Sequence, residues 1–298
     1  MSGDDSTTFY FDNDGLRLAG RIWNGPEKTS GGSDGETPLP IVCLPGLTRN
    51  SRDFGALAGA ILAEDPRRTI IAFDYRGRGL SQYADSPQAY TVPAEAADTI
   101  AGLDHLGISR AVFVGTSRGA LVIHAIAAMR PDLLAGAVFN DAGPRLETEG
   151  LRHIRDTVGV VESFPDWENA TDAVAAASAA TFPALSRDDF ARMALAGFIE
   201  RDGMIVGDYD ARLLEPLRIM DLDQPLPDLW EAFDRMKAVP LLVIRGEHST
   251  LFSRETVSEM AGRHEKMEAV TVEGQGHAPF LETAGLPARI LEFARQAG

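Results

Sequence analysis

Residues 115–119, which read Gly-Thr-Ser-Arg-Gly, place a serine at the centre of a glycine-rich turn. The turn follows the apolar run 111–114 and leads into the alanine-rich run 118–129, so a strand enters it and a helix leaves it. A strand-to-helix turn of this kind exposes the serine hydroxyl above the sheet. Its glycines allow close backbone approach, and the helix N-terminus favours negative charge nearby. The pattern predicts that Ser117 is a nucleophile; the alternative is a simple glycine-rich turn.

A serine hydroxyl is a weak nucleophile until a base removes its proton, and the sequence offers six histidines. His277 lies within 273–279, which read Glu-Gly-Gln-Gly-His-Ala-Pro. This short loop follows the last expected strand and precedes the C-terminal helix. A histidine on a loop at the carboxyl end of the sheet can reach a serine at the end of another strand, so we predict that His277 is the base.

The elements that must hold these two residues form an alternation of strands and helices. Residues 8–23, which alternate around Asn-Asp-Gly at 13–15, predict a β-hairpin. Short apolar runs then alternate with helical patterns, which is typical of a parallel sheet covered by helices. The expected strands are 40–44, 69–73, 111–114, 134–139, 240–244 and 269–272, and the expected helices are 51–63, 92–106, 118–129, 229–236, 254–263 and 287–297.

The alternation is interrupted between residues 145 and 228. This stretch shows helical patterns and no convincing strand, and residues 170–180 are almost all small. We therefore expect one core domain formed by 1–144 and 229–298, with a helical insertion at 145–228.

Motifs spread along the chain carry a family resemblance. The sequence resembles the α/β-hydrolase superfamily over nearly its whole length. The resemblance implies a serine–acid–histidine triad, an eight-stranded, mostly parallel sheet flanked by helices, and a helical cap after the sixth strand, where the insertion lies. The motifs are, in order, Leu-Pro-Gly-Leu at 44–47, Asp-Tyr-Arg-Gly-Arg-Gly-Leu-Ser at 74–81, the turn around Ser117, Arg-Gly-Glu at 245–247 and Gly-His at 276–277.

The resemblance also implies an oxyanion hole built from two backbone N–H groups. They are the N–H of Arg118, the residue after the serine, and that of Leu47, which follows the third strand. Such donors stabilise charge that appears only in the transition state. Pro45 stands where many relatives have histidine, but the backbone donor does not require that side chain. The Arg118 side chain either binds a substrate carboxylate or forms an ion pair with a neighbouring loop, and we favour the ion pair.

The acid of the triad is the hardest residue to place. Family members commonly carry an aspartate after the seventh strand, but residues 246–250 read Gly-Glu-His-Ser-Thr. Asp141 follows the sixth strand, where some members, including one group of haloalkane dehalogenases, place their acid. Glu247 lies nearer the usual place but is shifted in register, and a shift can aim a carboxylate wrongly at the imidazole. We predict Asp141, with Glu247 as the alternative and an incomplete triad as a third.

Composition limits the partners. The net charge of −16, from 28 basic and 44 acidic residues, disfavours nucleic acid and anionic membrane surfaces. The single cysteine forms no intramolecular disulfide, and no histidine and cysteine spacing or glycine-rich cradle suggests a metal or cofactor. The acidic residues 1–5 resemble no signal peptide, and no run of about 18 apolar residues occurs. We expect a cytoplasmic monomer or homodimer that binds a small molecule and needs no cofactor.

Three functions fit these residues. The first is hydrolysis of a small or medium carboxylic ester or lactone through an acyl-enzyme. The second is hydrolysis of a carbon–carbon bond in a diketone-type substrate, which the same fold and triad support. The third is a ligand receptor with low turnover, to which the missing usual aspartate gives some weight. Epoxide hydrolase and dehalogenase chemistry is disfavoured, because those relatives use an aspartate nucleophile where this chain has Ser117.

Overall fold

An eight-stranded sheet forms the centre of the computed structural model, which describes residues 6–23, 37–159, 163–224 and 226–298. The strand order is β1-β2-β4-β3-β5-β6-β10-β11. β2 pairs antiparallel with β1 and with β4, and the other neighbours are parallel. The predicted mostly parallel sheet is thereby confirmed. The strands are β1 (Thr7–Asn13), β2 (Leu16–Trp23), β3 (Ile41–Leu44), β4 (Ile70–Asp74), β5 (Ala111–Thr116), β6 (Leu134–Asn140), β10 (Leu241–Gly246) and β11 (Met267–Val272).

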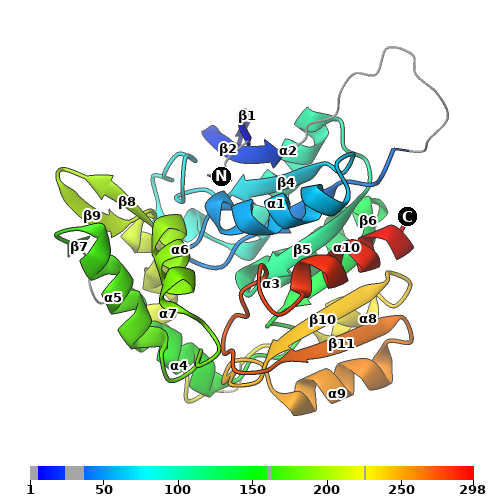
Figure 1. Ribbon diagram of the computed structural model, residues 1–298. Coiled ribbons are helices and arrows are strands. Elements are labelled where there is room, and N and C mark those ends of the chain that lie inside the picture. Colours follow the sequence, from blue (N-terminus) through cyan, green and yellow to red (C-terminus); the bar gives the residue numbers. More distant parts are fainter. Residues whose placement is uncertain (1–5, 24–36, 160–162, 225) are drawn as a thin grey trace.

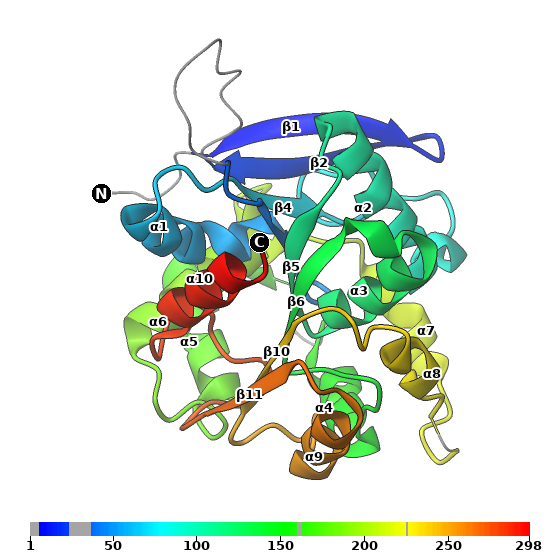
Figure 2. The same ribbon diagram turned by 90° about the vertical axis from the view of Figure 1, so that its right-hand side faces the viewer.

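The central strands are apolar along their whole length because helices cover both faces of the sheet. Every residue of β3, β4, β6 and β10 is buried, as expected for a parallel sheet between two helical layers. Two hydrophobic clusters result, one on each face. In Figure 2, α1 (Gly55–Glu64) and α10 (Leu286–Gln296) cover one face, and α2 (Val92–Leu106), α3 (Arg118–Met129), α8 (Trp230–Asp234) and α9 (Arg254–Arg263) cover the other.

The N-terminal hairpin forms where the Asn-Asp-Gly sequence predicts it. Asn13 pairs with Leu16, and the two residues between them, Asp14 and Gly15, have φ angles of +50° and +75°. Positive φ at both central residues is the geometry of the two-residue turn that suits the twist of a hairpin. The three-residue and four-residue 3₁₀ helices of the core are η1 (Ser51–Phe54), η2 (Pro87–Ala89) and η3 (Pro131–Leu133).

The segment between β6 and α8 contains strands, so the prediction of helices without a strand was wrong. β7 (Ser163–Phe164), β8 (Phe198–Arg201) and β9 (Met204–Gly207) form an antiparallel sheet in the order β7-β9-β8. Asp202 and Gly203, with φ of +53° and +77°, make the turn between β8 and β9. Aspartate-glycine between short apolar runs is a hairpin signal, and it was overlooked because helices dominate the surrounding sequence. The helices of the segment are α4 (Thr148–Thr157), α5 (Trp167–Ser178), α6 (Arg187–Gly197), η4 (Ala211–Leu214) and α7 (Glu215–Ile219).

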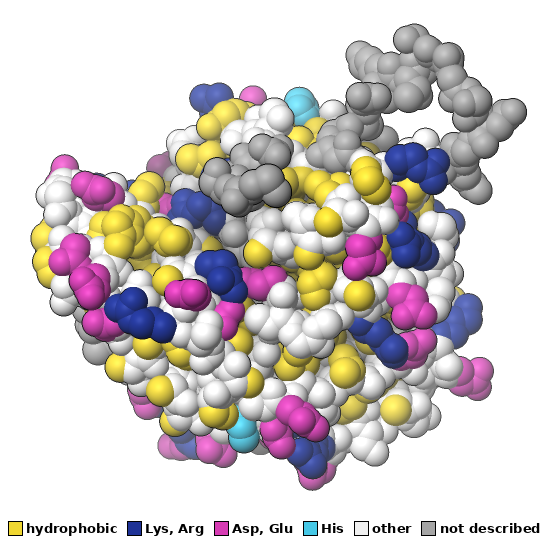
Figure 3. All heavy atoms as spheres, in the orientation of Figure 1, with side chains coloured by type: hydrophobic (Ala, Val, Ile, Leu, Met, Phe, Trp, Pro, Cys, Tyr) yellow, Lys and Arg dark blue, Asp and Glu magenta, His cyan; other side chains and the backbone are white. Residues whose placement is uncertain are grey.

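This segment gathers on one side of the core (Figure 1). Two core side chains near the end of β3 hold it there through its backbone. The Asn50 amide donates to the carbonyl oxygen of Ala196 at 3.0 Å, and the Arg52 guanidinium donates to that of Phe198, also at 3.0 Å. Over the face shown in Figure 3, acidic and basic side chains are interspersed. Within the described residues, no helix is long and apolar enough to span a membrane.

Candidate active site

The turn between β5 and α3 holds Ser117 in a conformation that few non-glycine residues adopt. Ser117 has φ of +53° and ψ of −111°, and such strain persists only where the surroundings fix it. A Cβ atom on Gly115 would lie 2.4 Å from the carbonyl carbon of Gly119, and one on Gly119 would lie 2.2 Å from the carbonyl oxygen of Leu44. Both glycines are therefore required because α3 starts directly against β5 and β3.

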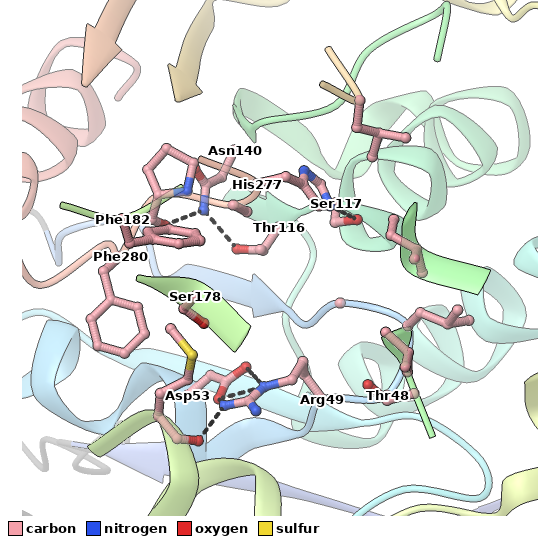
Figure 4. Close-up of a pocket in the computed structure, with 18 of the residues that line it drawn as sticks. Thr48, Arg49, Asp53, Thr116, Ser117, Asn140, Ser178, Phe182, His277 and Phe280 are labelled. Carbon is pink, nitrogen blue, oxygen red and sulfur yellow. Dashed lines mark hydrogen bonds and ion pairs between the residues drawn. The ribbon is translucent and has the colours of Figure 1, made fainter. Parts of the chain in front are cut away.

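Ser117, His277 and Asp141 form a continuous chain of hydrogen bonds. Nε2 of His277 lies 2.8 Å from Oγ of Ser117, and Nδ1 of His277 lies 2.7 Å from Oδ2 of Asp141. The Asp141 side chain is fully buried and the His277 side chain is 17% exposed. This arrangement has the connectivity of a nucleophile, a base and an acid that orients the base. The structure thus brings together the three residues that the sequence assigns to the triad. Figure 4 shows Ser117 and His277 of this chain.

The carboxylate of Asp141 is held on both of its oxygens. Asp141 follows β6 with φ of +59°, and its N–H donates to the carbonyl oxygen of Ile244 in β10 at 2.8 Å. The N–H of Gly246 donates to Oδ1 at 2.7 Å, which leaves Oδ2 for the imidazole. The carboxylate is therefore oriented by the strand that usually carries the acid in this fold.

Glu247, the alternative acid, lies elsewhere. Its side chain is 38% exposed, and Oε2 accepts a hydrogen bond of 2.8 Å from the N–H of Gly274. Gly274 belongs to the loop that carries His277. Glu247 is thus in contact with the backbone of the histidine loop, while Asp141 is in contact with the imidazole.

Asn140 also holds the histidine loop, and the sequence analysis did not identify it. Its amide nitrogen donates to the carbonyl oxygen of Pro279 at 3.0 Å and to Oγ1 of Thr116 at 3.2 Å. The backbone carbonyl oxygen of Asn140 accepts a hydrogen bond of 2.8 Å from the N–H of Ser117. The only signal in the sequence was its position next to Asp141, because the contacts to the loop join residues 139 positions apart.

The two residues predicted for the oxyanion hole lie on either side of Ser117. Leu47 lines the same cavity as Ser117, and Gly46 before it lies so close that an added Cβ would be 4.0 Å from Cβ of Ser117. Arg118 is the first residue of α3, and the N–H groups of the first turn of a helix have no partner within the helix. The Arg118 side chain donates to Oε2 of Glu95 at 2.6 Å, the ion pair that we favoured.

A cavity of about 350 Å³ opens above Ser117 and His277 (Figure 4). The core supplies its floor, and the segment between β6 and α8 supplies much of its wall. The wall residues come from α4 and the residue that follows it, from α5 and the loop after it, and from α6. They are Gly150, His153, Ile154, Thr157, Val158, Ser178, Phe182 and Met193.

Charged side chains line the end of the cavity away from Ser117, and the sequence analysis missed them. Nε of Arg49 donates to Oδ2 of Asp53 at 2.9 Å, and Nη2 donates to the carbonyl oxygen of Met193 at 3.0 Å. Glu282 lies beside them, 3.5 Å from Nε of Arg192. Burial raises the pKa of the Glu282 carboxyl to about 7, because desolvation disfavours the charged form.

Buried histidines elsewhere are unsuited to act as the base. His124 lies inside α3, its Nδ1 is 2.8 Å from the carbonyl oxygen of Ala120, and burial lowers its pKa to about 4. Burial also lowers the pKa of His264, whose Nε2 is 3.1 Å from the carbonyl oxygen of Met236. Among the residues that the structure describes, no three histidine, cysteine or acidic side chains are grouped so that they could hold a metal ion.

Comparison with known proteins gives one consistent family. The model of the alpha/beta hydrolase family matches residues 41–289. The chain is 29% identical over 259 residues to 3-hydroxybutyrate-oligomer hydrolase of Cupriavidus necator, covering 84% of this chain and 87% of that protein. It is 31% identical over 249 residues to 2-(acetamidomethylene)succinate hydrolase of Mesorhizobium japonicum, covering 82% of each. A crystal structure of an alpha/beta hydrolase from Novosphingobium aromaticivorans matches with a TM-score of 0.86 and 36% identity, over 98% of this chain and 99% of that one.

Substituting each of the two candidate acids should have a different effect on kcat. We expect Asp141→Asn to lower kcat for a chromogenic ester by about 10³-fold or more, because an asparagine favours the wrong imidazole tautomer. Glu247→Gln should keep kcat within about 10-fold, because its contact is with the backbone of the loop. Steady-state kinetics of both purified variants, with thermal melting to establish that each is folded, decides between them. Near-normal turnover by Asp141→Asn together with inactive Glu247→Gln would show that the acid is Glu247.

Proposed function

Because the chain belongs to the α/β-hydrolase family and is a hydrolase, we propose that it cleaves carboxylic esters or lactones through an acyl-enzyme on Ser117. The observation that carries this proposal is the hydrogen-bonded chain from Ser117 Oγ through His277 to Asp141, with distances of 2.8 and 2.7 Å. A serine in contact with an oriented imidazole is the arrangement that activates a hydroxyl for attack on a carbonyl carbon.

The geometry supplies each step of acyl transfer. His277 accepts the proton of Ser117 through Nε2 as Oγ attacks the carbonyl, and the buried Asp141 carboxylate stabilises the imidazolium through Nδ1. The backbone N–H groups of Leu47 and Arg118 stabilise the oxyanion of the tetrahedral intermediate. The imidazolium then protonates the leaving alcohol. Water, deprotonated by the same histidine, releases the acid and restores Ser117.

The segment 145–228 serves in this proposal as the cap of a core formed by 1–144 and 229–298. Its described residues from α4, α5 and α6 line the cavity above Ser117, opposite the triad. Enclosing a substrate between cap and core removes water from the reacting groups and strengthens their electrostatic interactions. The cap contributes to the choice of substrate, because eight of the residues that line the cavity belong to it.

The cavity supports a substrate of small or medium size. Its volume of about 350 Å³ lies at the low end of the range of roughly 300–1,000 Å³ for small-molecule sites. Several apolar side chains line it, among them Ile154, Val158, Phe182, Met193 and Leu251. The similarity to a protein named 3-hydroxybutyrate-oligomer hydrolase supports a hydroxy-acid ester as the first substrate to test.

The proposal is tested with a panel of p-nitrophenyl esters, simple lactones, a 3-hydroxybutyrate dimer and a vinylogous diketone. We expect wild-type protein to hydrolyse members of the ester and lactone set, and Ser117→Ala to lose about 10³-fold or more in kcat/KM, because Ser117 is the only hydroxyl among the described residues that forms a hydrogen bond with His277. The variant keeps the cavity and therefore controls for non-enzymatic hydrolysis at the protein surface.

Two other outcomes would contradict the ester proposal. Faster cleavage of the diketone than of every ester, still dependent on Ser117, would establish the carbon–carbon hydrolase. Wild-type protein that turns over no member of the panel would favour the low-turnover receptor.

A further inference from the structure

A second cavity, of about 360 Å³, adjoins the cavity above Ser117. Three residues, Asp53, Phe280 and Glu282, line both cavities and therefore form the wall between them. In Figure 4, Phe280 and Asp53 lie at the far end of the inner cavity from Ser117. The outer cavity therefore lies beyond the end of the inner cavity that is farthest from Ser117. Its other lining residues are Trp23, Arg52, Gly55, Ala56, Arg192, Leu195 and Ala196.

The outer cavity offers apolar surface to a ligand beside its charged side chains. Gly55 and Ala56 at the start of α1 present almost no side chain, which leaves the hollow open. Leu195 of α6 is 54% exposed and forms part of the opposite side. Leu195 shares this hollow with Trp23 and Phe280, and a concave site lined by several apolar and aromatic side chains is typical of ligand binding.

The residues of the wall between the cavities differ in how firmly hydrogen bonds and ion pairs hold their side chains. Two hydrogen bonds to Arg49 at 2.9 and 3.1 Å fix the Asp53 carboxylate. Glu282 is held less tightly, because its nearest guanidinium nitrogen, Nε of Arg192, lies 3.5 Å away. Phe280 is half-buried, and movement of its ring breaks no side-chain hydrogen bond. A ligand that extended from the inner to the outer cavity would therefore pass Phe280.

We propose that the outer cavity is a subsite for the distal part of a linear, uncharged acyl chain of medium length whose ester carbonyl lies at Ser117. This inference rests on the proposed ester hydrolase. The chain is uncharged because the guanidiniums at the wall, Arg49 and Arg192, already face Asp53 and Glu282. A charged tail would have to break one of these ion pairs to pass.

The test fills the outer cavity and compares acyl-chain lengths. Ala56→Trp places an indole in the outer cavity, and Gly59→Trp places the same side chain one turn further along α1, outside the cavity, where an added Cβ meets nothing within 4 Å. The measured quantity is the ratio of kcat/KM for p-nitrophenyl decanoate to that for p-nitrophenyl acetate. We expect Ala56→Trp to lower this ratio by about 10-fold or more, and Gly59→Trp to leave it within about twofold.

An unchanged ratio in Ala56→Trp, or an equal fall in both variants, would overturn the subsite. So would wild-type protein that hydrolyses the acetate and not the decanoate. Absence of activity towards every ester is a different result, because it contradicts the proposed function itself. Phe280→Ala provides a second readout, since widening the passage should raise the ratio.

Three charged residues, of which Arg78 and Glu95 are fully buried, are linked behind the proposed oxyanion hole. Nη1 of Arg78 lies 2.9 Å from Oε1 of Glu95, and Nε of Arg118 lies 2.6 Å from Oε2 of the same carboxylate. Nε of Arg78 donates to the carbonyl oxygen of Leu47 at 2.9 Å. One carboxylate is therefore connected to both residues whose N–H groups form the proposed oxyanion hole.

Burying this network has a desolvation cost that a purely structural role does not explain. The side chains of Arg78 and Glu95 are fully buried, and Nη2 of Arg78 is buried with no hydrogen-bond partner. Removing charges from water is unfavourable, and buried ion pairs often stabilise a fold no better than apolar side chains would. We infer that Glu95 is a positioning residue that fixes the peptides of Leu47 and Arg118 relative to Ser117, and this inference too rests on the proposed function.

Glu95→Gln tests the positioning role, with Asp98→Asn as a matched control. Asp98 lies on the same helix, is also buried, and accepts hydrogen bonds of 2.7 and 2.8 Å from Arg76, which contacts neither oxyanion residue. We expect Glu95→Gln to lower kcat by about 10²-fold and to weaken binding of a trifluoromethyl ketone, which forms an oxyanion adduct with serine, by a similar factor. KM should stay within about threefold, and Asp98→Asn should change neither kcat nor ketone affinity by more than that.

Equal losses of kcat in both variants would show that Glu95 has only a structural role. A rise in KM with unchanged kcat would show the same. If Glu95→Gln does not fold, Arg118→Met breaks one arm of the network at a side chain that is 17% exposed. That variant should show the same paired loss of kcat and ketone affinity, and wild-type values for both would overturn the inference.

Discussion

The fully buried carboxylate of Asp141 must be satisfied on both oxygens, and the way it is satisfied joins three separate parts of the chain. A charge without partners in the interior is strongly unfavourable. Oδ1 takes the N–H of Gly246 at the end of β10, and Oδ2 takes Nδ1 of His277. Since β5, β6 and β10 are neighbours in the sheet, their carboxyl ends bring Ser117, Asp141 and Gly246 together. The position of the imidazole follows from this one carboxylate.

Backbone strain is concentrated at the same place. Ser117 and Asp141 both have positive φ, +53° and +59°, which is uncommon for residues with a side chain. Each is over-determined by its neighbours, Ser117 by the hydrogen bond from its N–H to Asn140 and Asp141 by the one from its N–H to Ile244. Strain held in this way pre-organises reacting groups, so that little rearrangement is needed when charge develops.

Local signals in the sequence were sufficient for the sheet, the turn around Ser117 and the loop of His277. Each depends on glycines or apolar runs within about ten residues. The acid of the triad was harder to predict from the sequence. Choosing between Asp141 and Glu247 requires knowing which side chain contacts the imidazole of His277, 136 positions after Asp141. The hairpin from β8 to β9 had a local signal in Asp202 and Gly203 that helical surroundings obscured. The end of the cavity away from Ser117 had no local signal, because Asp53, Met193 and Glu282 come from three distant segments.

The central claim is that His277 and Asp141 make Ser117 the reactive nucleophile, and covalent labelling tests it most directly. The protein is treated with a fluorophosphonate, and the adduct is located by intact-mass and peptide mass spectrometry. The account predicts one adduct per chain, on the peptide that contains Ser117, and none in folded Ser117→Ala or His277→Ala protein. Labelling of another residue, or no labelling of folded wild-type protein, would contradict it.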